Sequence, residues 1–384
     1  MDFAGVVVAA GSGSRAGAGS AKQWRPLGGR PVLRWSAEAL LDAGAAEVVV
    51  VIPAGADAEA AGALEGLRRW RTVAGGATRT DSVRAGLDAV RIDETAAVLI
   101  HDAARPLLAG SVVSRLLKAL AQADAALPVL PVADSLKRDG GGVSAGAVER
   151  DGLVRAQTPQ AFRLAPLRAA YAAWPDDAAA TDDVAVFEAA GGRVALVQGD
   201  PALMKLTYPE DFAMAEALIA WETRMGLGLD AHRWGPGDTV WICGVPICHH
   251  QTLVGHSDAD AGLHALTDAI LGAIGDGDIG DHFPPSDPQW KGARSDQFLV
   301  HAVERVRARG GRLVNVDVTL VCEQPRIKPH RAAMKARLAE LLDLPLDAVS
   351  VKATTTEGMG FAGRQEGLAA QAIAAVALPV RPAS

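Results

Sequence analysis

A glycine-rich segment near the start of the sequence carries two cationic side chains. Residues 9–13 read Ala-Ala-Gly-Ser-Gly, and Arg15 and Lys22 follow closely. Glycine leaves backbone N–H groups open to phosphate oxygens because no Cβ stands in the way. Two added cations suit a triphosphate that is attacked at phosphorus, since negative charge builds up on its oxygens. For this segment alone, a glycine turn with solvated Arg and Lys side chains is an equal alternative.

The same glycines also fit, in part, the fingerprint of a dinucleotide-binding fold. That fingerprint needs an acidic residue about 20 positions further on to hold a ribose. The second apolar run of the sequence ends near Ile52, and Asp57 lies too far along the chain. The sequence therefore disfavours an NAD-dependent dehydrogenase, and it also lacks a Walker A pattern in this half.

Three further segments of the first half favour a phosphate site. A second glycine loop, residues 75–83, runs into a helical pattern and is rich in hydrogen-bond donors. Asp102 directly follows an apolar run, where its carboxylate is placed to bind a divalent cation. Lys205 lies in an apolar stretch that we expect to be a strand, and a buried lysine either extends to solvent or meets an anion.

The second half of the sequence holds a set of potential metal ligands. Of nine histidines, only His101 precedes residue 230. Asp230 and His232 are two positions apart, so on a strand their side chains share one face. His264 and Asp268 are four positions apart and share one face of a predicted helix. One aspartate and two histidines with an open position suit Zn²⁺, or a similar ion, held for chemistry.

The other histidines fit ordinary structural roles better. His249 and His250 adjoin Cys248, but a second Cys/His pair at zinc-finger spacing is missing. We expect His301 on a helix surface and His330 at the start of a helix. Two loops remain as anion sites: residues 275–285, which are rich in aspartate, and residues 352–357, which combine three threonines with a glutamate.

The elements that position these residues indicate an α/β protein. In the first half, apolar β-branched runs at 5–10, 47–52, 97–100, 126–129 and 193–197 alternate with helical patterns at 30–43 and 110–123. This alternation predicts a mostly parallel sheet covered on both faces. Thr207–Glu210 has a capping-box pattern that opens a helix to about residue 222.

The second half predicts an α+β or α/β sandwich. Strands are expected at 226–232, 314–322 and 349–354, and helices at 259–274, 296–309, 331–342 and 367–376, with a loop over 275–291. No Pro/Gly/Ser-rich linker separates the halves.

Composition limits the classes of function. The chain has 384 residues, 49% of them hydrophobic, and a formal net charge of −7. That balance argues against broad nucleic-acid binding, and no apolar run approaches the roughly 18 residues of a membrane-spanning helix. Three cysteines and an acidic N-terminus without a signal peptide point to a cytoplasmic protein.

The motifs of the first half, taken in order, resemble 2-C-methyl-D-erythritol 4-phosphate cytidylyltransferase. They are Ala-Ala-Gly-x-Gly-x-Arg, Gly-Gly-x-x-Arg-x-x-Ser-Val, His-Asp-Ala-Ala-Arg-Pro, Thr-Pro-Gln, Thr-Asp-Asp and Lys-x-Thr-x-Pro-Glu-Asp. The resemblance implies a Rossmann-like nucleotidyltransferase domain over residues 1–222. It implies that CTP contacts Ala9, Ala10, Gly11, Gly76, Ser82 and Ala103, and that Asp102 helps to hold Mg²⁺ or Mn²⁺. Arg15 and Lys22 would stabilise the reacting phosphates, and Arg150, Thr181 and Lys205 would position methylerythritol phosphate.

The motifs of the second half resemble 2-C-methyl-D-erythritol 2,4-cyclodiphosphate synthase. They are Gly-x-Gly-x-Asp-x-His, Gly-His-Ser-Asp-x-Asp, Leu-His-Ala-Leu-Thr-Asp, Gly-Asp-Ile-Gly, Asn-Val-Asp-Val-Thr and Lys-Ala-Thr-Thr-Thr-Glu. The resemblance implies an α+β domain over residues 223–384 with Zn²⁺ on Asp230, His232 and His264 and a second cation on Glu357. The remaining implied contacts are Ala353, Thr354 and Thr355 with the cytidine diphosphate, His256 and Ser257 with the erythritol phosphate, and Asp278, Gly280, Phe361 and Arg364 with the substrate.

Together the two resemblances predict a bifunctional enzyme of the non-mevalonate isoprenoid pathway. It would transfer CMP from CTP to methylerythritol phosphate, and it would cyclise the later phosphorylated product with release of CMP. The resemblance implies a homo-oligomer, trimeric through the second domain and possible as a hexamer, with small-molecule substrates, no nucleic acid and no membrane. The alternative is a single nucleotidyltransferase with a C-terminal metal- or nucleotide-binding regulatory module.

Overall fold

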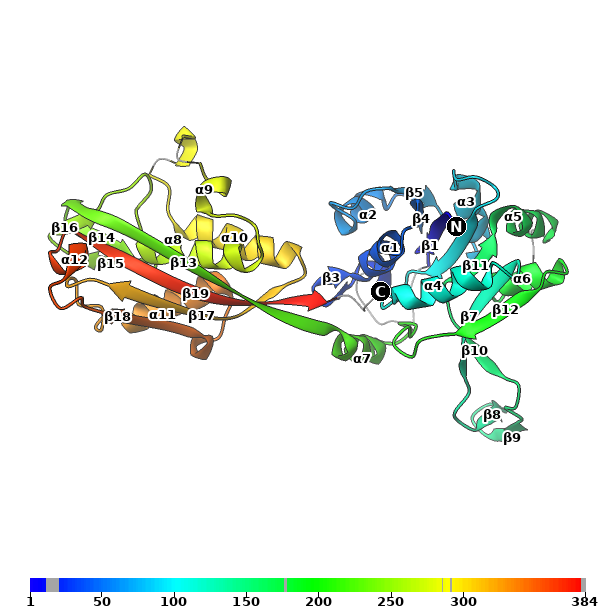
Figure 1. Ribbon diagram of the computed structural model, residues 1–384. Helices are drawn as coiled ribbons and strands as arrows, with labels where there is room; N and C mark the ends of the chain where they lie inside the picture. The colour runs from blue at the N-terminus through cyan, green and yellow to red at the C-terminus, as the bar shows by residue number, and fades with distance from the viewer. Residues whose placement is uncertain (12–20, 176–177, 285, 291, 381–384) are drawn as a thin grey trace. The chain divides into compact units, whose positions relative to one another are not determined.

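The computed structural model describes residues 1–11, 21–175, 178–284, 286–290 and 292–380 (Figure 1). The chain divides into two compact units, residues 1–220 and 221–380. Among the described residues, no helix has the length and apolar character needed to cross a membrane.

Unit 1 is built on a mostly parallel sheet. In the described residues its strands run in the order β10-β7-β11-β6-β1-β4-β5, with β12 also paired to β7. The β1, β4, β5 and β6 strands are parallel to one another, as are β7 and β12, whereas β11 is antiparallel to both its neighbours. Their bounds are β1 (Phe3–Val8), β4 (Glu47–Ile52), β5 (Trp70–Ala74), β6 (Ala97–Asp102), β7 (Ala125–Pro131), β10 (Val154–Ala156), β11 (Gln160–Arg163) and β12 (Val194–Gln198).

Helices cover both faces of this sheet, as the alternating sequence pattern predicts. Val7 and Val50 belong to one apolar core and Val6 and Val51 to another, because neighbouring side chains on a strand point to opposite faces. The helices are η2 (Lys22–Trp24), α1 (Val32–Asp42), α2 (Asp57–Ala63), α3 (Arg79–Ala89), α4 (Gly110–Ala119), α5 (Leu164–Ala173), α6 (Asp183–Ala189) and α7 (Pro209–Leu218). The predicted α/β class of this half is confirmed.

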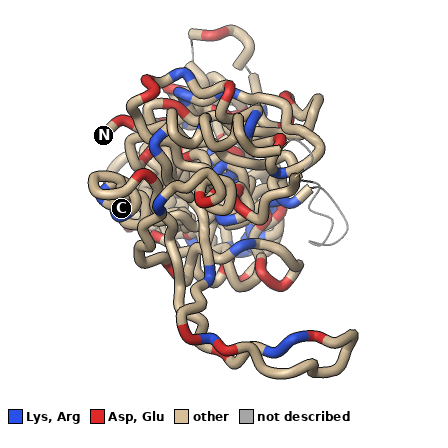
Figure 2. Tube along the Cα trace, turned by 90° about the vertical axis from the view of Figure 1, so that its right-hand side faces the viewer, with Lys and Arg blue, Asp and Glu red and all other residues tan. Residues whose placement is uncertain are grey.

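Two short hairpins complete unit 1. The strands β2 (Pro26–Leu27) and β3 (Arg30–Pro31) form one, and β8 (Leu136–Asp139) and β9 (Ser144–Val148) form the other. The second hairpin extends from the sheet as an arm that carries both acidic and basic residues (Figure 2). The sequence analysis did not predict this arm, because its strands are exposed and lack an apolar pattern.

Two local predictions for unit 1 are wrong. Lys205 lies outside the strands, in the segment between β12 and α7, where it has no ladder to join. The helix α7 begins one residue later than the predicted capping box, because the Asp211 carboxylate accepts from the backbone N–H groups of Thr207 and Tyr208 at 2.7 and 2.8 Å. It ends at Leu218, and the chain passes directly into β13 (Ala220–Pro236).

Unit 2 is built on a second sheet, with helices packed against it. Its strand order over the described residues is β16-β13-β19-β17-β18, and β14 (Thr239–Ile242) and β15 (Val245–Cys248) form a hairpin. The other strands are β16 (Gln251–Leu253), β17 (Arg312–Val321), β18 (Val349–Thr354) and β19 (Gly367–Val380). The helices are α8 (Ala261–Ala273), α9 (Ile279–His282), η3 (Pro288–Trp290), α10 (Asp296–Ala308), α11 (Arg331–Leu342), η4 (Leu346–Ala348) and α12 (Gly360–Gly363).

The predicted helix over residues 367–376 is a strand. Its alanine-rich sequence resembles a helix by composition, but β19 lies between β13 and β17 and packs against α8. Small side chains suit that position because helix and strand approach closely there. The predicted loop over 275–291 also contains the short helices α9 and η3.

Two glycines of β13 bring α8 against the sheet. A Cβ on Gly226 would lie 1.9 Å from the carbonyl oxygen of Ala269, and one on Gly228 would lie 1.9 Å from that of Ala265. Real side chains do not fit at these distances. The Gly-x-Gly part of the motif therefore fixes the distance between β13, which carries Asp230 and His232, and α8, which carries His264.

We expect Gly228→Ala to destabilise unit 2 by about 1–3 kcal/mol, because the added methyl group forces the α8 backbone away from β13. Gly272→Ala is the matched control: Gly272 lies exposed on the same helix with nothing within 4 Å of its Cβ position. That change should stabilise by about 0.5–1 kcal/mol, since alanine favours helix. Hydrogen exchange of the slowest α8 amides measures both, and equal protection in the two variants would contradict the close-approach argument.

Candidate active sites

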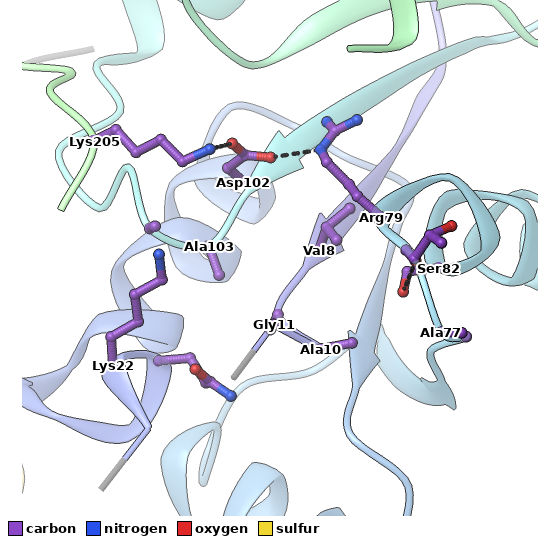
Figure 3. Close-up of a pocket in the computed structure, with 15 residues that line it drawn as sticks. Val8, Ala10, Gly11, Lys22, Ala77, Arg79, Ser82, Asp102, Ala103 and Lys205 are labelled. Carbon is purple, nitrogen blue, oxygen red and sulfur yellow. Dashed lines mark hydrogen bonds and ion pairs between the residues drawn. The ribbon is translucent and has the colours of Figure 1, made fainter. Parts of the chain in front are cut away.

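A pocket of about 470 Å³ lies at the carboxyl ends of the central strands of unit 1 (Figure 3). Ligands of parallel sheets bind at this edge. The two glycine loops meet here, because a Cβ on Gly75 would lie 2.4 Å from Ala10 Cβ. The residues predicted from sequence that line the pocket are Ala9, Ala10, Gly11, Lys22, Gly76, Ser82, Asp102, Ala103 and Lys205.

Asp102 is the charged centre of the pocket. Its carboxylate accepts from Lys205 Nζ at 2.6 Å and from Arg79 Nε at 3.2 Å (Figure 3). Burial alone would raise the pKa of this carboxyl, but Arg79 and Lys205 outweigh burial and hold the pKa well below its usual range. Asp102 is therefore ionised, and an ionised oxygen donor is what Mg²⁺ prefers.

Arg79 is a pocket residue to which the sequence analysis gave no role. Its guanidinium also donates to both oxygens of the fully buried Asp183, at 3.0 and 2.7 Å. Burial lowers the pKa of Arg79, whereas Asp183 and Asp102 together raise it more, so the guanidinium stays positively charged. The signal was available, since Arg79 stands in the Gly-Gly-x-x-Arg motif at the first position of α3.

His101 precedes Asp102 on β6 and links the end of this strand to neighbouring segments. It is fully buried, with Nδ1 3.1 Å from Thr158 Oγ1 and Nε2 3.0 Å from the carbonyl oxygen of Arg105. Thr158 Oγ1 also accepts from the Asp102 backbone N–H at 3.0 Å. Burial lowers the pKa of His101 to about 4, although Asp102 raises it in part. The ring is neutral at pH 7.

Two sequence-predicted residues of this half, Arg150 and Thr181, are not among the described residues that line the pocket. Arg15 lies outside the described residues. Arg150 lies between β9 and β10, where it donates to the carbonyl oxygen of Ala133. Thr181 is exposed and precedes the Asp182 cap of α6. The structure therefore brings together the nucleotide-loop residues, Asp102 and Lys205, but not Arg150 or Thr181.

Unit 2 contains a cluster of three potential metal ligands. Asp230 Oδ2 lies 2.9 Å from His232 Nε2 and 2.9 Å from His264 Nδ1, and the two nitrogens are 3.2 Å apart. Within the described ranges, this is the only group of three or more His, Cys, Asp or Glu residues with converging ligand atoms. The i, i+2 spacing on β13 and the position of His264 on α8 place the atoms as the sequence predicts.

The donor set fits a divalent cation. His232 Nδ1 lies 3.1 Å from the carbonyl oxygen of Val254, so when a metal displaces the hydrogen bond to Asp230 the ring proton is donated to that carbonyl and Nε2 offers its lone pair. Burial raises the pKa of Asp230, but hydrogen bonds from His232 and His264 lower it more and keep the carboxylate ionised. Burial lowers the pKa of His232, but Asp230 raises it above the ordinary value. Two imidazoles and one carboxylate suit a transition-metal ion such as Zn²⁺.

The remaining ligand and substrate candidates of unit 2 lie apart from these converging atoms, except for Ser257. Ser257 Oγ is 3.1 Å from His264 Nε2. Glu357 is exposed and accepts from Thr355 Oγ1 at 3.0 Å, outside the cluster. Asp278 caps α9, whose first N–H donates to Asp268 at 2.8 Å, and Asp268 is not part of the cluster of converging ligand atoms. The others, which the structure places on exposed or capping segments without a described contact to the cluster, are His256, Gly280, Ala353, Thr354, Phe361 and Arg364.

The histidines that the sequence analysis excluded from the metal site have different surroundings in the structure. The ring of His249 contacts the rings of Trp234 and His250 in tilted arrangements, at centroid distances of 4.9 and 4.3 Å. His330 stands at the N-cap of α11 without a side-chain cap. His301 lies on α10 as predicted and is partly exposed, but its Nε2 also lies 3.1 Å from His282 Nδ1, a contact that the sequence analysis did not predict.

Comparison with known proteins identifies both units. Residues 3–220 match the family model of 2-C-methyl-D-erythritol 4-phosphate cytidylyltransferase, and residues 223–377 match the YgbB family. The chain is 66% identical over 382 residues to a bifunctional enzyme IspD/IspF of Caulobacter vibrioides, covering 99% of this chain and 100% of that protein. The chain belongs to the bifunctional IspD/IspF family.

Further relatives of the IspD/IspF family agree with this assignment. The bifunctional enzyme of Maricaulis maris is 56% identical over 97% of this chain and 98% of its own length. The solved bifunctional IspDF of Campylobacter jejuni is 31% identical, covers 98% of this chain and 99% of its own, and superposes with a TM-score of 0.52. The chain is thus an enzyme of isoprenoid biosynthesis with a cytidylyltransferase domain and a cyclodiphosphate synthase domain, which decides against the regulatory-module alternative.

The burial of His101 leads to a pH prediction for unit 1. Its pKa of about 4 in the fold lies below the ordinary value of 6.5. The unfolded chain therefore binds more protons between these values, and the stabilisation from neutral His101 is lost as pH falls from about 6.5 to about 4, by about 1.4 kcal/mol per pH unit. The unfolding free energy should decrease from pH 7 to pH 5 in both proteins, and the decrease should be smaller in His101→Gln than in the wild type. Ring NMR signals of His101 that titrate near 6.5 would contradict this.

Proposed function

We propose that the two reactions take place at two separate sites, one in each unit. The observation that carries this proposal is that each unit holds, at its candidate site, an ionised carboxylate beside cationic or metal-ligating groups. In unit 1 this is Asp102 in the glycine-loop pocket, and in unit 2 it is Asp230 in the ligand cluster.

In unit 1 the pocket would bind CTP and methylerythritol phosphate. A phosphate oxygen of methylerythritol phosphate attacks the α-phosphorus of CTP, and the bond to the β-phosphate breaks to release pyrophosphate. The glycine-loop residues Ala9, Ala10 and Gly11, with Gly76, Ser82 and Ala103, would surround the nucleotide. Asp102 would hold Mg²⁺ or Mn²⁺, which supplies charge neutralisation to the nucleotide phosphates.

The cationic side chains of the protein would stabilise the reacting phosphates and position the second substrate. Lys22 lines the pocket, and with Arg15 it would stabilise the charge on the attacked phosphate and the departing pyrophosphate. Lys205 lines the same pocket and, with Arg150 and Thr181, would position methylerythritol phosphate. Little bond-making chemistry is asked of the protein, since alignment of two anions and neutralisation of their charge account for catalysis.

In unit 2 the cluster would bind Zn²⁺ through Asp230, His232 and His264. The 2-phosphate of the phosphorylated cytidine diphosphate compound attacks the β-phosphorus, and CMP leaves. Bound zinc supplies a positive charge that the attacking phosphate can approach. His256 and Ser257 would meet the erythritol phosphate, Ala353, Thr354 and Thr355 the cytidine diphosphate, and Glu357 a second cation, while Asp278, Gly280, Phe361 and Arg364 would complete the substrate site.

We further propose a cytoplasmic homo-oligomer, trimeric through unit 2 and hexameric if unit 1 also pairs. Glu357 lies outside the ligand cluster, and Arg150 is not part of the lining of the unit 1 pocket, so a second copy could supply each. Met225, Leu227 and Leu229 expose 60–69% of their surface on the face of β13 opposite α8, as an interface strand would. All three cysteines are free, which fits a reducing compartment.

We expect Lys22→Met to slow pyrophosphate release from CTP by roughly 100- to 1000-fold, because one contact to the charged transition state is lost. CMP release by unit 2 should remain at the wild-type rate. Lys118→Met is the control, since Lys118 is exposed on α4 and away from the pocket. Equal rates of pyrophosphate release in the two variants would show that Lys22 does not take part in the transfer reaction.

We expect His264→Ala to lower zinc content and CMP release together, while CTP-dependent transfer persists. His250→Ala serves as the control, because His250 is exposed and belongs to the set of histidines excluded above. Zinc and protons compete for the imidazole nitrogens, so zinc occupancy should fall as the pH is lowered. Elemental analysis decides between the sites: full zinc in His264→Ala together with loss in His250→Ala would overturn the assignment.

A further inference from the structure

A serine and an aspartate stand behind the proposed metal ligand His264. The side of the ring that faces the cluster is Nδ1, which is 2.9 Å from Asp230 Oδ2. The opposite nitrogen, Nε2, lies 2.8 Å from Ser295 Oγ. Ser295 is fully buried, so this contact is not shared with solvent.

The Ser295 hydroxyl is turned away from the role that its position usually gives it. Ser295 is the N-cap residue of α10, and an N-cap serine normally accepts from a backbone N–H of the first helical turn. No such side-chain bond exists here. The hydroxyl instead donates to Asp258 Oδ1, while the Ser295 backbone N–H donates to Asp258 Oδ2 at 3.1 Å.

The direction of these hydrogen bonds follows from the chemistry of the groups. An ionised carboxylate only accepts, so the Ser295 O–H proton goes to Asp258 and the oxygen keeps lone pairs for another donor. When Nδ1 of His264 binds a metal, Nε2 carries the only ring proton, and Ser295 Oγ is its nearest acceptor. Ser257 Oγ is more distant, at 3.1 Å, and already accepts from the Ala259 N–H.

We propose that Asp258 and Ser295 form a relay that holds the His264 ring with Nε2–H outward and the Nδ1 lone pair toward the metal. Both are positioning residues, since neither lies in the ligand cluster itself. His232 is oriented by a backbone carbonyl, and His264 by this side-chain pair. The relay rests on the proposed zinc site, and hydrogen-bonded partners of this kind typically change metal affinity by about 10- to 100-fold.

The first test compares two buried hydroxyls of unit 2 in the full-length, zinc-loaded protein. Ser295→Ala removes the acceptor of Nε2–H, whereas Thr267→Val removes a hydroxyl that donates to the Leu263 carbonyl on α8, one turn from His264. We expect zinc affinity, measured by competition with a chromophoric chelator, to fall about 10- to 100-fold in Ser295→Ala and to stay unchanged in Thr267→Val.

The second readout is spectroscopic and does not depend on activity. In the zinc-loaded wild type, the His264 Nε2–H proton should give a resolved NMR signal protected from solvent exchange. Ser295→Ala should lose that protection, and Thr267→Val should keep it. A role of Ser295 limited to folding would change neither this signal nor zinc affinity in the folded fraction.

Asp258→Asn tests the direction of the relay with little change of shape. The asparagine side chain has one acceptor oxygen, so it can accept from only one of the two Ser295 donors. Its NH₂ group then faces either the Ser295 backbone N–H, where two donors meet, or the Ser295 hydroxyl, whose proton must then point toward His264 Nε2. We expect weaker zinc binding in either case. Zinc affinity equal to Thr267→Val in both relay variants would overturn the relay, whereas full zinc binding in His264→Ala would instead overturn the proposed metal site.

Discussion

Two phosphate groups repel each other, and each reaction of this family must bring two of them into contact. Each of the two proposed sites contains an ionised carboxylate, Asp102 in unit 1 and Asp230 in unit 2, which its neighbours keep in the charged form. An ionised carboxylate that is partly buried attracts cations strongly because little water screens it. The end of β6 positions Asp102, and the close contact of β13 with α8 positions Asp230 beside His264.

The two carboxylates differ in the neighbours that keep them charged. Arg79 and Lys205 are bound to Asp102 by ion pairs, so this site already carries fixed positive charge. His232 and His264 surround Asp230, and these rings offer lone pairs to a metal only when they are neutral. We therefore expect the proposed unit 1 site to depend little on pH near neutrality, and metal binding at the proposed unit 2 site to be coupled to proton release.

The sequence predicts most of what depends on local pattern, and fails where packing decides. The parallel sheet of unit 1 and the cluster of Asp230, His232 and His264 follow from strand alternation and from i, i+2 spacing. The alanine-rich sequence of β19 predicts a helix, but the structure shows a strand. Alanine occurs there because β19 packs closely against α8, which a local sequence pattern does not reveal. The sequence analysis does not identify Arg79 or Ser295 as site residues. Their contacts are with residues distant in sequence, Asp183 and His264 respectively.

The most direct test is the position of divalent cations in crystals of the full-length protein grown with Mn²⁺ and CTP, measured by anomalous diffraction. Mn²⁺ accepts both oxygen and imidazole ligands and can occupy both sites. The account predicts one peak bonded to Asp102 beside the nucleotide phosphates and another among Asp230, His232 and His264. A peak at His249 and His250, or nucleotide bound away from Asp102, would contradict it.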